Sequence, residues 1–296
     1  MSCNNGGPPW YAWDANGEIQ YGEVPERLLR HPGLKELGIV PHYAYKPGVV
    51  FATMPSEGPE YVVKILDLNT EELPIYERLL GDIENPRNHT IPCKIVRNGH
   101  PVLVMPCLGF LHPNILVKGR HRPLSWLIRA FHELTEGVEY LHSLHIAHLD
   151  LCEGNVILAS QGRAALHEEI IDRRLYIIDF DTSRQFELGP GRQPSITLPQ
   201  TQVPPPDGLT TFDPYSWDIY CLGDLLQSFS EVILQHYYEK QGSPPRMVRW
   251  FTAWLIGRER GCSGVCHCRP SARAARRILD VLQWIAPVVD MLTGRR

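Results

Sequence analysis

Apolar residues form short runs in the first third of the chain, and residues that favour turns separate these runs. Runs of apolar, β-branched and aromatic residues that are bounded in this way are typical of β-strands. Asn98 and Gly99 favour a tight hairpin between the last two runs. A helix start is predicted at 69–72, because Asn69 and Thr70 can cap a helix and acids follow them. The four predicted strands cover residues 49–52, 61–66, 91–96 and 101–105.

Beyond this region, apolar positions recur roughly every three or four residues, the spacing of one face of an α-helix. The predicted helix 125–143 shows this spacing at Leu127, Phe131 and Leu134. The segment 183–214 is rich in Pro, Gly, Gln and Thr, and it is predicted to be a long loop, which is often functional in a compact domain. Further helices are predicted at 26–30, 217–238, 247–256 and 272–292, and short strands at 155–159 and 175–179.

This order of elements predicts an α+β fold in which a small β-rich part precedes a larger helical part. The border between the two parts lies near residues 105–109. Prolines interrupt the first forty residues, which we expect to pack on the surface or to stay partly mobile. The expected division is an N-terminal extension at 1–40, a small part at 41–108 and a larger part at 109–296.

Composition narrows the class of function. The chain has 296 residues, of which 43% are hydrophobic and 21% charged, so a folded protein is expected. Lys and Arg number 29 against 33 Asp and Glu, and a net charge of −4 favours neither nucleic acid nor an anionic membrane as partner. With no secretory signal pattern and no long apolar stretch, the eight cysteines are expected to be reduced thiols, and the protein to be cytoplasmic or nuclear.

One spaced set of polar residues carries recognisable chemistry. His148, Asp150 and Asn155 follow the long predicted helix in the pattern H-x-D-x-x-x-x-N. Asp179 comes 24 residues after Asn155, behind two isoleucines and before Phe180. This combination resembles the catalytic loop and the start of the activation segment in the protein-kinase superfamily. The resemblance covers roughly residues 43–290 and implies a bilobal protein-kinase-like fold, with a small β-rich N-lobe and a larger α-helical C-lobe.

The resemblance implies ATP and Mg²⁺ as cofactors and assigns roles to five residues. Phosphoryl transfer depends mainly on positioning the acceptor and holding the metal against the phosphates. Asp150 is expected to orient the acceptor hydroxyl, while Asn155 and Asp179 are expected to supply oxygen ligands to Mg²⁺. Lys64 is expected to hold the α- and β-phosphates, and Glu72 to pair with it. Glu77 remains an alternative partner for that lysine.

Other segments match landmarks of the same family. Residues 102–109 resemble the last N-lobe strand and the hinge, with Met105 as gatekeeper. Pro106 has no N–H and would offer adenine only its carbonyl, whereas Leu108 would donate an N–H. Asp218 stands in a sequence similar to the helix whose acid binds the catalytic loop in the family. Arg269 begins an R-P-S-A sequence that resembles the start of a late helix.

The chain also departs from the family pattern at positions that matter for nucleotide binding. The phosphate-covering loop keeps only Gly48, so fewer backbone N–H groups are expected to reach the phosphates. Leu149 replaces the catalytic-loop arginine, so no switch by activation-loop phosphorylation is expected. Cys152 replaces a lysine and removes a positive charge. Asp181 replaces the glycine of D-F-G, and Asp207 is the nearest stand-in for the missing A-P-E acid and a candidate partner of Arg269. Such departures are similar to those of the divergent kinase-like proteins of filamentous fungi.

Three functions remain open. The first is an ATP-dependent kinase that phosphorylates Ser or Thr hydroxyls of a protein substrate, and the retained polar set supports it. The second is a weak or inactive kinase-like binding module, which the lost glycines, Cys152 and Asp181 favour. The third is a small-molecule phosphotransferase similar to aminoglycoside or choline kinases, because these share the I-D-F-acid string ending at Asp181.

Several residues have plainer interpretations. His148 is expected to be a packed structural histidine, and Phe180 and Tyr76 are expected to be core residues. The crowded set Cys262, Cys266, His267 and Cys268 raises the question of zinc, but it lacks the second, separated pair of ligands that structural zinc sites use. Reduced thiols in a loop are the favoured interpretation there. No sequence feature indicates an oligomeric state.

Overall fold

The chain folds into two compact units, and each is described by itself. Unit 1 comprises Met1–Asn69, Ile91–Leu108 and Ser160–Asp172, and unit 2 comprises Thr70–Thr90, Gly109–Ala159 and Arg173–Arg296. The computed structural model describes residues 10–55, 58–110, 123–237, 244–257 and 264–292.

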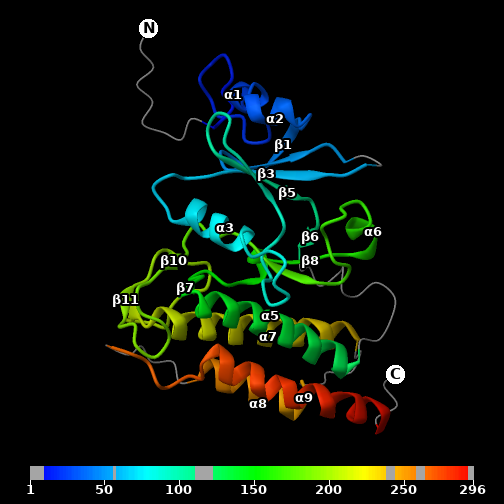
Figure 1. Cartoon of the computed structure of the whole chain (residues 1–296), viewed down its shortest axis with the longest axis vertical. Helices are drawn as coiled ribbons and strands as arrows, with labels where there is room; N and C mark the ends of the chain where they lie inside the picture. Colours follow the sequence, from blue (N-terminus) through cyan, green and yellow to red (C-terminus); the bar gives the residue numbers. More distant parts are fainter. Residues whose placement is uncertain (1–9, 56–57, 111–122, 238–243, 258–263, 293–296) are drawn as a thin grey trace. The chain divides into compact units, whose positions relative to one another are not determined.

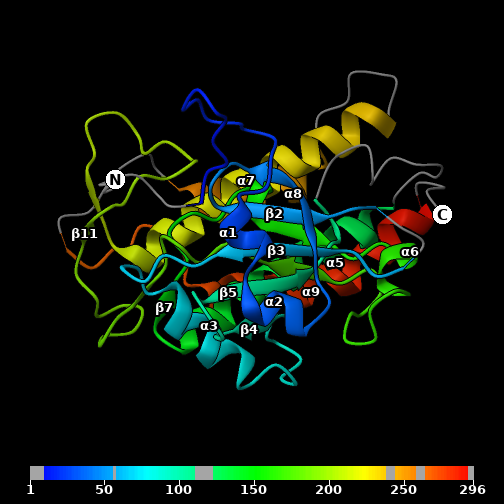
Figure 2. The same cartoon turned by 90° about the horizontal axis from the view of Figure 1, so that it is seen from above.

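Unit 1 is built on a five-stranded antiparallel sheet in the order β1-β2-β3-β5-β4. Figure 2 shows β2, β3 and β5 running side by side. The predicted strands are present, with an additional edge strand, β1, ahead of them. The strands are β1 (Pro41–Lys46), β2 (Val50–Thr53), β3 (Tyr61–Ile65), β4 (Lys94–Val96) and β5 (Val102–Pro106).

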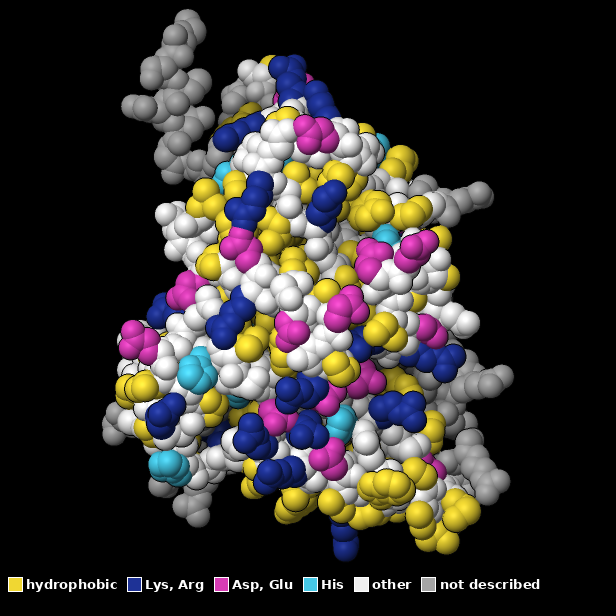
Figure 3. Space-filling model, viewed as in Figure 1, with side chains coloured by type: hydrophobic (Ala, Val, Ile, Leu, Met, Phe, Trp, Pro, Cys, Tyr) yellow, Lys and Arg dark blue, Asp and Glu magenta, His cyan; other side chains and the backbone are white. Residues whose placement is uncertain are grey.

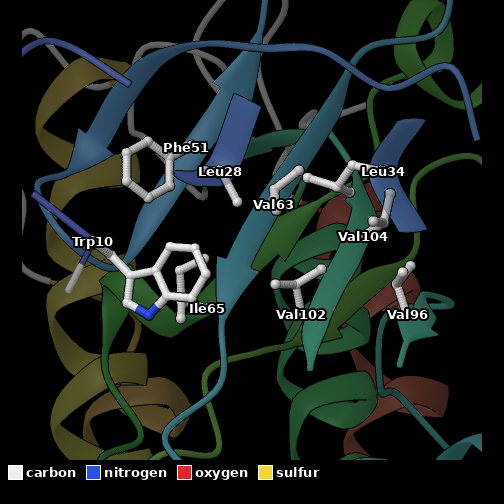
Figure 4. Close-up of a cluster of buried hydrophobic side chains, with 9 residues drawn as sticks. All are labelled: Trp10, Leu28, Leu34, Phe51, Val63, Ile65, Val96, Val102 and Val104. Carbon is white, nitrogen blue, oxygen red and sulfur yellow. The ribbon is translucent and has the colours of Figure 1, made fainter. Parts of the chain in front are cut away.

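One face of this sheet carries the apolar core of unit 1, which Figure 4 shows in close-up. Alternate residues of β3 and β5, such as Val63 and Val102, point into it because successive side chains of a strand face opposite sides. The N-terminal segment supplies the other half of the core, through Trp10, Leu28 and Leu34. Leu28 belongs to α1 (Glu26–Leu29) and Leu34 to α2 (Pro32–Glu36). Part of the expected extension 1–40 therefore packs into the core of unit 1, whereas residues such as Trp13 and Tyr21 are exposed.

A short insertion between two strands of unit 2 belongs to unit 1. Residues Ser160–Asp172 include α6 (Gln161–Ala164). Arg163 forms an ion pair of 2.5 Å with the buried Glu60, and the ring of His167 lies edge-on to that of Tyr61 at 5.3 Å. These contacts join the insertion to β3, so a segment distant in sequence completes this side of the unit.

Unit 2 is largely helical, and α5, α7, α8 and α9 form its main body (Figure 1). Asp290 of α9 accepts hydrogen bonds from the backbone N–H groups of Leu124 and Ser125, at 2.8 and 2.9 Å. These N–H groups have no partner within their own helix, so the carboxylate caps the start of α5. The helices are α3 (Glu72–Leu80), α5 (Leu124–Ser143), α7 (Pro214–Tyr237), α8 (Arg246–Ile256) and α9 (Ala272–Leu292).

The strands of unit 2 are short. β8 (Val156–Leu158) pairs with β6 (Gly109–Phe110) and with β9 (Leu175–Ile177), and a 3-10 turn at Glu153–Asn155 leads into β8. The predicted long loop 183–214 contains short strands. These pairs are β7 (Ile146–Ala147) with β10 (Arg184–Gln185), and β11 (Ile196–Thr197) with β12 (Thr211–Phe212).

The predicted α+β class is confirmed, because an N-terminal antiparallel sheet is followed by a largely helical region, as in kinase-like folds. The units differ from the expected parts 41–108 and 109–296 in two places. Residues 70–90, with α3, fall in unit 2, and residues 160–172 fall in unit 1. Within the described ranges, no helix is long and apolar enough to cross a membrane.

Candidate active site

The loop between β7 and β8 in unit 2 is held by one buried carboxylate. Asp218 of α7 is fully buried. Its two oxygens accept hydrogen bonds from the backbone N–H groups of His148 and Leu149, both at 2.8 Å. The ring Nε2 of His142 lies 2.9 Å from the same carboxylate. A buried carboxylate that accepts three such bonds fixes the loop backbone in one conformation.

Further polar contacts hold the carbonyl groups of this loop. Trp217 donates its indole N–H to the carbonyl of Leu149 at 2.9 Å, and Ser183 donates its hydroxyl to the carbonyl of His148 at 2.9 Å. Leu149 has a φ of +68°, a left-handed conformation that is strained for a leucine. These bonds and the full burial of the Leu149 side chain keep the strained backbone in place.

His148 has a structural role in this unit, as the sequence predicts. Its Nδ1 accepts a hydrogen bond from the backbone N–H of Asp150, so its Nε2 carries the proton that it donates to the carbonyl of Ile178 at 3.0 Å. The ring lies 5.1 Å from that of Phe180. Nε2 therefore joins the catalytic-loop candidate to the segment that carries Asp179, while Nδ1 bonds within the loop.

Asp150 is buried, and donors surround its carboxylate. Asn155 donates its amide to the carbonyl of Asp150 at 2.8 Å and to its Oδ2 at 3.2 Å. Gln202 approaches from the segment after β11: its backbone N–H donates to Oδ1 at 2.6 Å and its side-chain amide donates to Oδ2 at 2.9 Å. Each carboxylate oxygen of Asp150 therefore has a bond to Gln202. No sequence motif singled out Gln202, because only the fold brings it to this loop.

Asn155 and Asp179 lie at the same end of the β8–β9 pair. Val156 is opposite Ile177 in this pair, and the N–H of Ile178 donates to the carbonyl of Asn155 at 3.0 Å. The amide nitrogen of Asn155 is engaged by Asp150, so its amide oxygen is the group left for a cation. That oxygen and the half-buried Asp179 carboxylate are hard donors of the kind that Mg²⁺ prefers, so these residues fit the metal.

Helix α3 joins this arrangement through Tyr76. The Tyr76 hydroxyl accepts a long hydrogen bond of 3.4 Å from the backbone N–H of Asp179, and its ring lies edge-on to Phe180 at 5.1 Å. Tyr76 and Phe180 are both fully buried, consistent with the expected core role. On the same helix Glu72 is buried and Glu77 is exposed, so Glu72 is the acid that needs a partner inside the protein.

Cys152 stands between two acids of the site and remains neutral. Burial is the main cause that raises the pKa of its thiol to about 11, and the negative charges of Asp150 and Asp179 raise it further. A thiol with this pKa is protonated at neutral pH. Cys152 therefore supplies no positive charge at this position.

The remaining candidate residues lie in unit 1. Lys64 is a buried residue of β3 and stands opposite Leu103 of β5. Met105 and Pro106 end β5, where they pair with Val62 and Tyr61, and they are followed by the buried Leu108. Lys64, Met105 and Pro106 thus lie in one sheet, and their expected roles stay predictions.

The turn between β1 and β2 leaves little room for a side chain at Gly48. Gly48 has a φ of +76°, which glycine adopts without strain. A Cβ at this position would lie 2.7 Å from Cζ of Tyr11, so the N-terminal segment packs directly on the turn. The turn therefore contains one glycine, at a position where the backbone favours glycine and a Cβ would displace the ring of Tyr11.

Arg269 does not make the expected contact with Asp207. Arg269 donates to the carbonyl of Ile256 at 2.7 Å and to the hydroxyl of Ser216 at 3.4 Å, whereas Asp207 is exposed and makes no contact with it. The suggested pair of Asp207 and Arg269 is therefore wrong.

Cys262 lies outside the described residues, and no group of three or more His, Cys, Asp or Glu within them is placed to hold a metal.

Comparison with known proteins adds a distant and partial similarity to serine/threonine protein kinases. No model of a protein family matches the chain. A stretch of 115 residues, 38% of the chain, is 30% identical to serine/threonine-protein kinase stk11 of Xenopus laevis and covers 25% of that protein. A stretch of 102 residues, 34% of the chain, is 31% identical to serine/threonine-protein kinase STK11 of Rattus norvegicus and covers 21% of it. The matched stretch thus spans at most a quarter of the length of these curated relatives.

Proposed function

We propose that this protein is an ATP-dependent phosphotransferase that transfers the γ-phosphate to a Ser or Thr hydroxyl of a protein substrate. The observation that carries the proposal is the loop in unit 2, where Asp150 and Asn155 are bonded to each other on a backbone that Asp218 fixes. The partial similarity to serine/threonine protein kinases supports the same class of reaction.

The proposed roles follow from the chemistry of each group. Asp150 accepts a hydrogen bond from the acceptor hydroxyl and orients it toward the phosphate. Asn155 and Asp179 would hold Mg²⁺, which neutralises charge on the phosphates when it is bound. Lys64 would bind the α- and β-phosphates, Glu72 would orient Lys64, and the backbone near Met105, Pro106 and Leu108 would bind adenine. The buried position of Glu72 favours it over Glu77 as the partner of Lys64.

Two features predict slow catalysis. Gln202 occupies both oxygens of Asp150, so the segment that carries it must move before an acceptor hydroxyl can bind there. The neutral thiol of Cys152 contributes no positive charge to the transferring phosphate. The same features favour a second candidate, a kinase-like binding module with little or no activity.

The test measures transfer of labelled phosphate from Mg-ATP to a protein acceptor by the full chain. Asp150→Asn keeps the size of the side chain and is expected to lower the rate by about 10²–10⁴-fold, the contribution typical of a positioned acid–base group. Glu153→Gln, an exposed residue of the same loop, is the matched control and is expected to keep the rate. Equal rates for Asp150→Asn and the unmodified protein would reject the proposal. Stabilisation by Mg-ATP without any transfer would select the binding module.

A further inference from the structure

A surface cavity of unit 1 lies outside the candidate active site. Its volume is about 380 Å³, within the range of pockets that hold small ligands. The N-terminal segment and the turn between β4 and β5 line it together. The lining residues used below are Trp10, Arg27, Arg30, His31, Pro32 and His100.

Arg27 lines this cavity, and its guanidinium lies over an aromatic ring. The guanidinium carbon is 4.4 Å from the centre of the Trp10 ring, which is the geometry of a cation–π contact. No described residue accepts a hydrogen bond from this guanidinium. The cation–π contact with the ring uses none of the guanidinium N–H donors in a hydrogen bond to a described residue, so they remain for a ligand. A guanidinium edge matches the two oxygens of a phosphate or carboxylate.

The cavity lining keeps a net positive charge when the groups around Arg27 are counted. Arg30 follows Arg27 by three residues, on the same side of the helical turn, and its Nε donates to Glu26 at 2.5 Å. That bond balances one of the two arginines. The rings of His31 and His100 are held by backbone groups: Nε2 of His31 lies 2.7 Å from the His100 carbonyl, and Nε2 of His100 lies 2.8 Å from the Leu66 carbonyl.

The ring of Trp10 is not open to a nucleobase or another flat ligand. Trp10 is 4% exposed, Arg27 covers its ring, and His100 lies against it at 5.1 Å. Arg27 and Arg30 are themselves exposed, and Figure 3 shows basic side chains over the end of unit 1 that carries α1 and α2. A compact oxyanion on the surface of a larger molecule can therefore reach both arginines.

We propose that this cavity binds a phosphate monoester carried by a peptide, such as a phosphorylated Ser or Thr side chain. Arg27 binds the phosphate oxygens with the N–H donors of its guanidinium and supplies the positive charge of the lining, and Trp10 holds that group through the cation–π contact. Arg30, whose charge Glu26 balances, adds its Nη donors. The proposal goes beyond the phosphotransferase function and does not depend on it, because it uses no residue of the candidate active site.

The experiment measures binding of the full chain to a fluorescent pool of peptides that are random around one phosphoserine, by fluorescence anisotropy. The same pool without phosphate is the reference, and it is expected to bind at least tenfold more weakly. Arg27→Ala is expected to weaken binding of the phosphorylated pool at least tenfold, and Arg27→Lys several-fold, because lysine keeps the charge but loses the planar edge. Lys35→Ala, an exposed basic residue of α2, is the control and should stay within twofold.

Three results would overturn the proposal. The first is equal binding of the two pools. The second is an equal loss in Lys35→Ala and Arg27→Ala, which would indicate diffuse charge attraction rather than a site. The third is competition by inorganic phosphate at the same concentration as the phosphorylated pool, which would make the free ion the ligand. Thermal unfolding of Arg27→Lys checks that its effect on binding arises in the folded protein.

Discussion

The loop 145–155 in unit 2 and the turn between β1 and β2 in unit 1 are fixed in contrasting ways. The loop in unit 2 depends on buried polar groups, because Asp218, Trp217 and Ser183 all bond to its backbone. The turn in unit 1 depends on shape, because Gly48 has a positive φ and the ring of Tyr11 packs against it. The register between β1 and β2 is also irregular.

The difference indicates where this chain tolerates change. A loop held by a buried charge needs its acceptor, because any unpaired N–H group in the interior is costly. A turn held by packing needs only space and a suitable φ. The predictions below test this contrast, from the largest expected effect to the smallest.

Asp218→Ala is expected to have the largest effect. The change removes the acceptor of the His148 and Leu149 N–H groups and leaves the ring of His142 without its partner. Removing one member of such a buried network lowers the free energy of unfolding by about 3–5 kcal/mol. Denaturant-induced unfolding measures this loss of free energy. Asp218→Asn is expected to lose less stability, because its amide keeps one oxygen as an acceptor. A loss below about 1 kcal/mol in Asp218→Ala would contradict the role given to this carboxylate.

Gly48→Ala is expected to have an intermediate effect. The added Cβ would meet Tyr11 at 2.7 Å and would also require alanine at a φ of +76°. Crowding and the left-handed conformation together are expected to lower the free energy of unfolding by about 2–4 kcal/mol.

Gly38→Ala is the control for that change. Gly38 has a φ of +67° but no atom within 4 Å of the added Cβ, so its expected loss is about 1–2 kcal/mol from the backbone alone. Equal losses in the two variants would show that Tyr11 does not constrain the turn.

Gln202→Ala is expected to change activity more than stability. It removes the side-chain donor to Oδ2 of Asp150 and keeps the backbone donor to Oδ1. Because Gln202 is exposed, the loss of stability is expected to stay below about 1 kcal/mol. The rate of phosphate transfer is expected to rise about three- to tenfold, since one competing hydrogen bond is gone.

Gln200→Ala is the control for the release of Asp150, because Gln200 is an exposed glutamine of the same segment. Initial rates with a protein acceptor measure the effect. A lower rate in Gln202→Ala would mean that Gln202 helps to position Asp150 and does not block it. The same rise in both variants would point to the segment as a whole.

Modification of Cys152 is expected to be slow at neutral pH. Its pKa is raised to about 11, so the reactive thiolate is scarce at pH 7 and increases roughly tenfold for each unit of pH up to that value. Alkylation by iodoacetamide, followed by mass spectrometry of the peptide, measures the rate from pH 7 to 10. A rate that levels off below pH 9 would show an ionised thiol and would contradict the neutral site.

The sequence predicts local features of this protein well. The runs at 49–52, 61–66 and 101–105 lie in or next to strands of the sheet, because short apolar runs bounded by turn residues have few other solutions. The spacing from Asp150 to Asn155 suffices to place two polar groups on one loop. The predicted helix 272–292 agrees with α9 residue for residue, since its apolar positions follow the helical period throughout.

Features that depend on contacts between distant parts of the chain could not be predicted from the sequence. Gln202 meets Asp150 across 52 residues, and no local pattern signals that contact. The burial of Trp10 depends on α1 and on a sheet that forms later in the chain. Residues 160–172 belong to unit 1 through contacts with distant residues, such as the ion pair between Arg163 and Glu60. The roles of Lys64, Glu72, Met105, Pro106 and Leu108 stay predictions.

A crystal structure of the full chain with Mg²⁺ and a non-hydrolysable ATP analogue tests the central claim most directly. The account predicts one nucleotide with Mg²⁺ bound by the amide oxygen of Asn155 and the carboxylate of Asp179, and with the ammonium of Lys64 on the α- and β-phosphates. Asp150 would then face the γ-phosphate. A nucleotide that contacts none of these side chains, or a metal that neither Asn155 nor Asp179 coordinates, would contradict it.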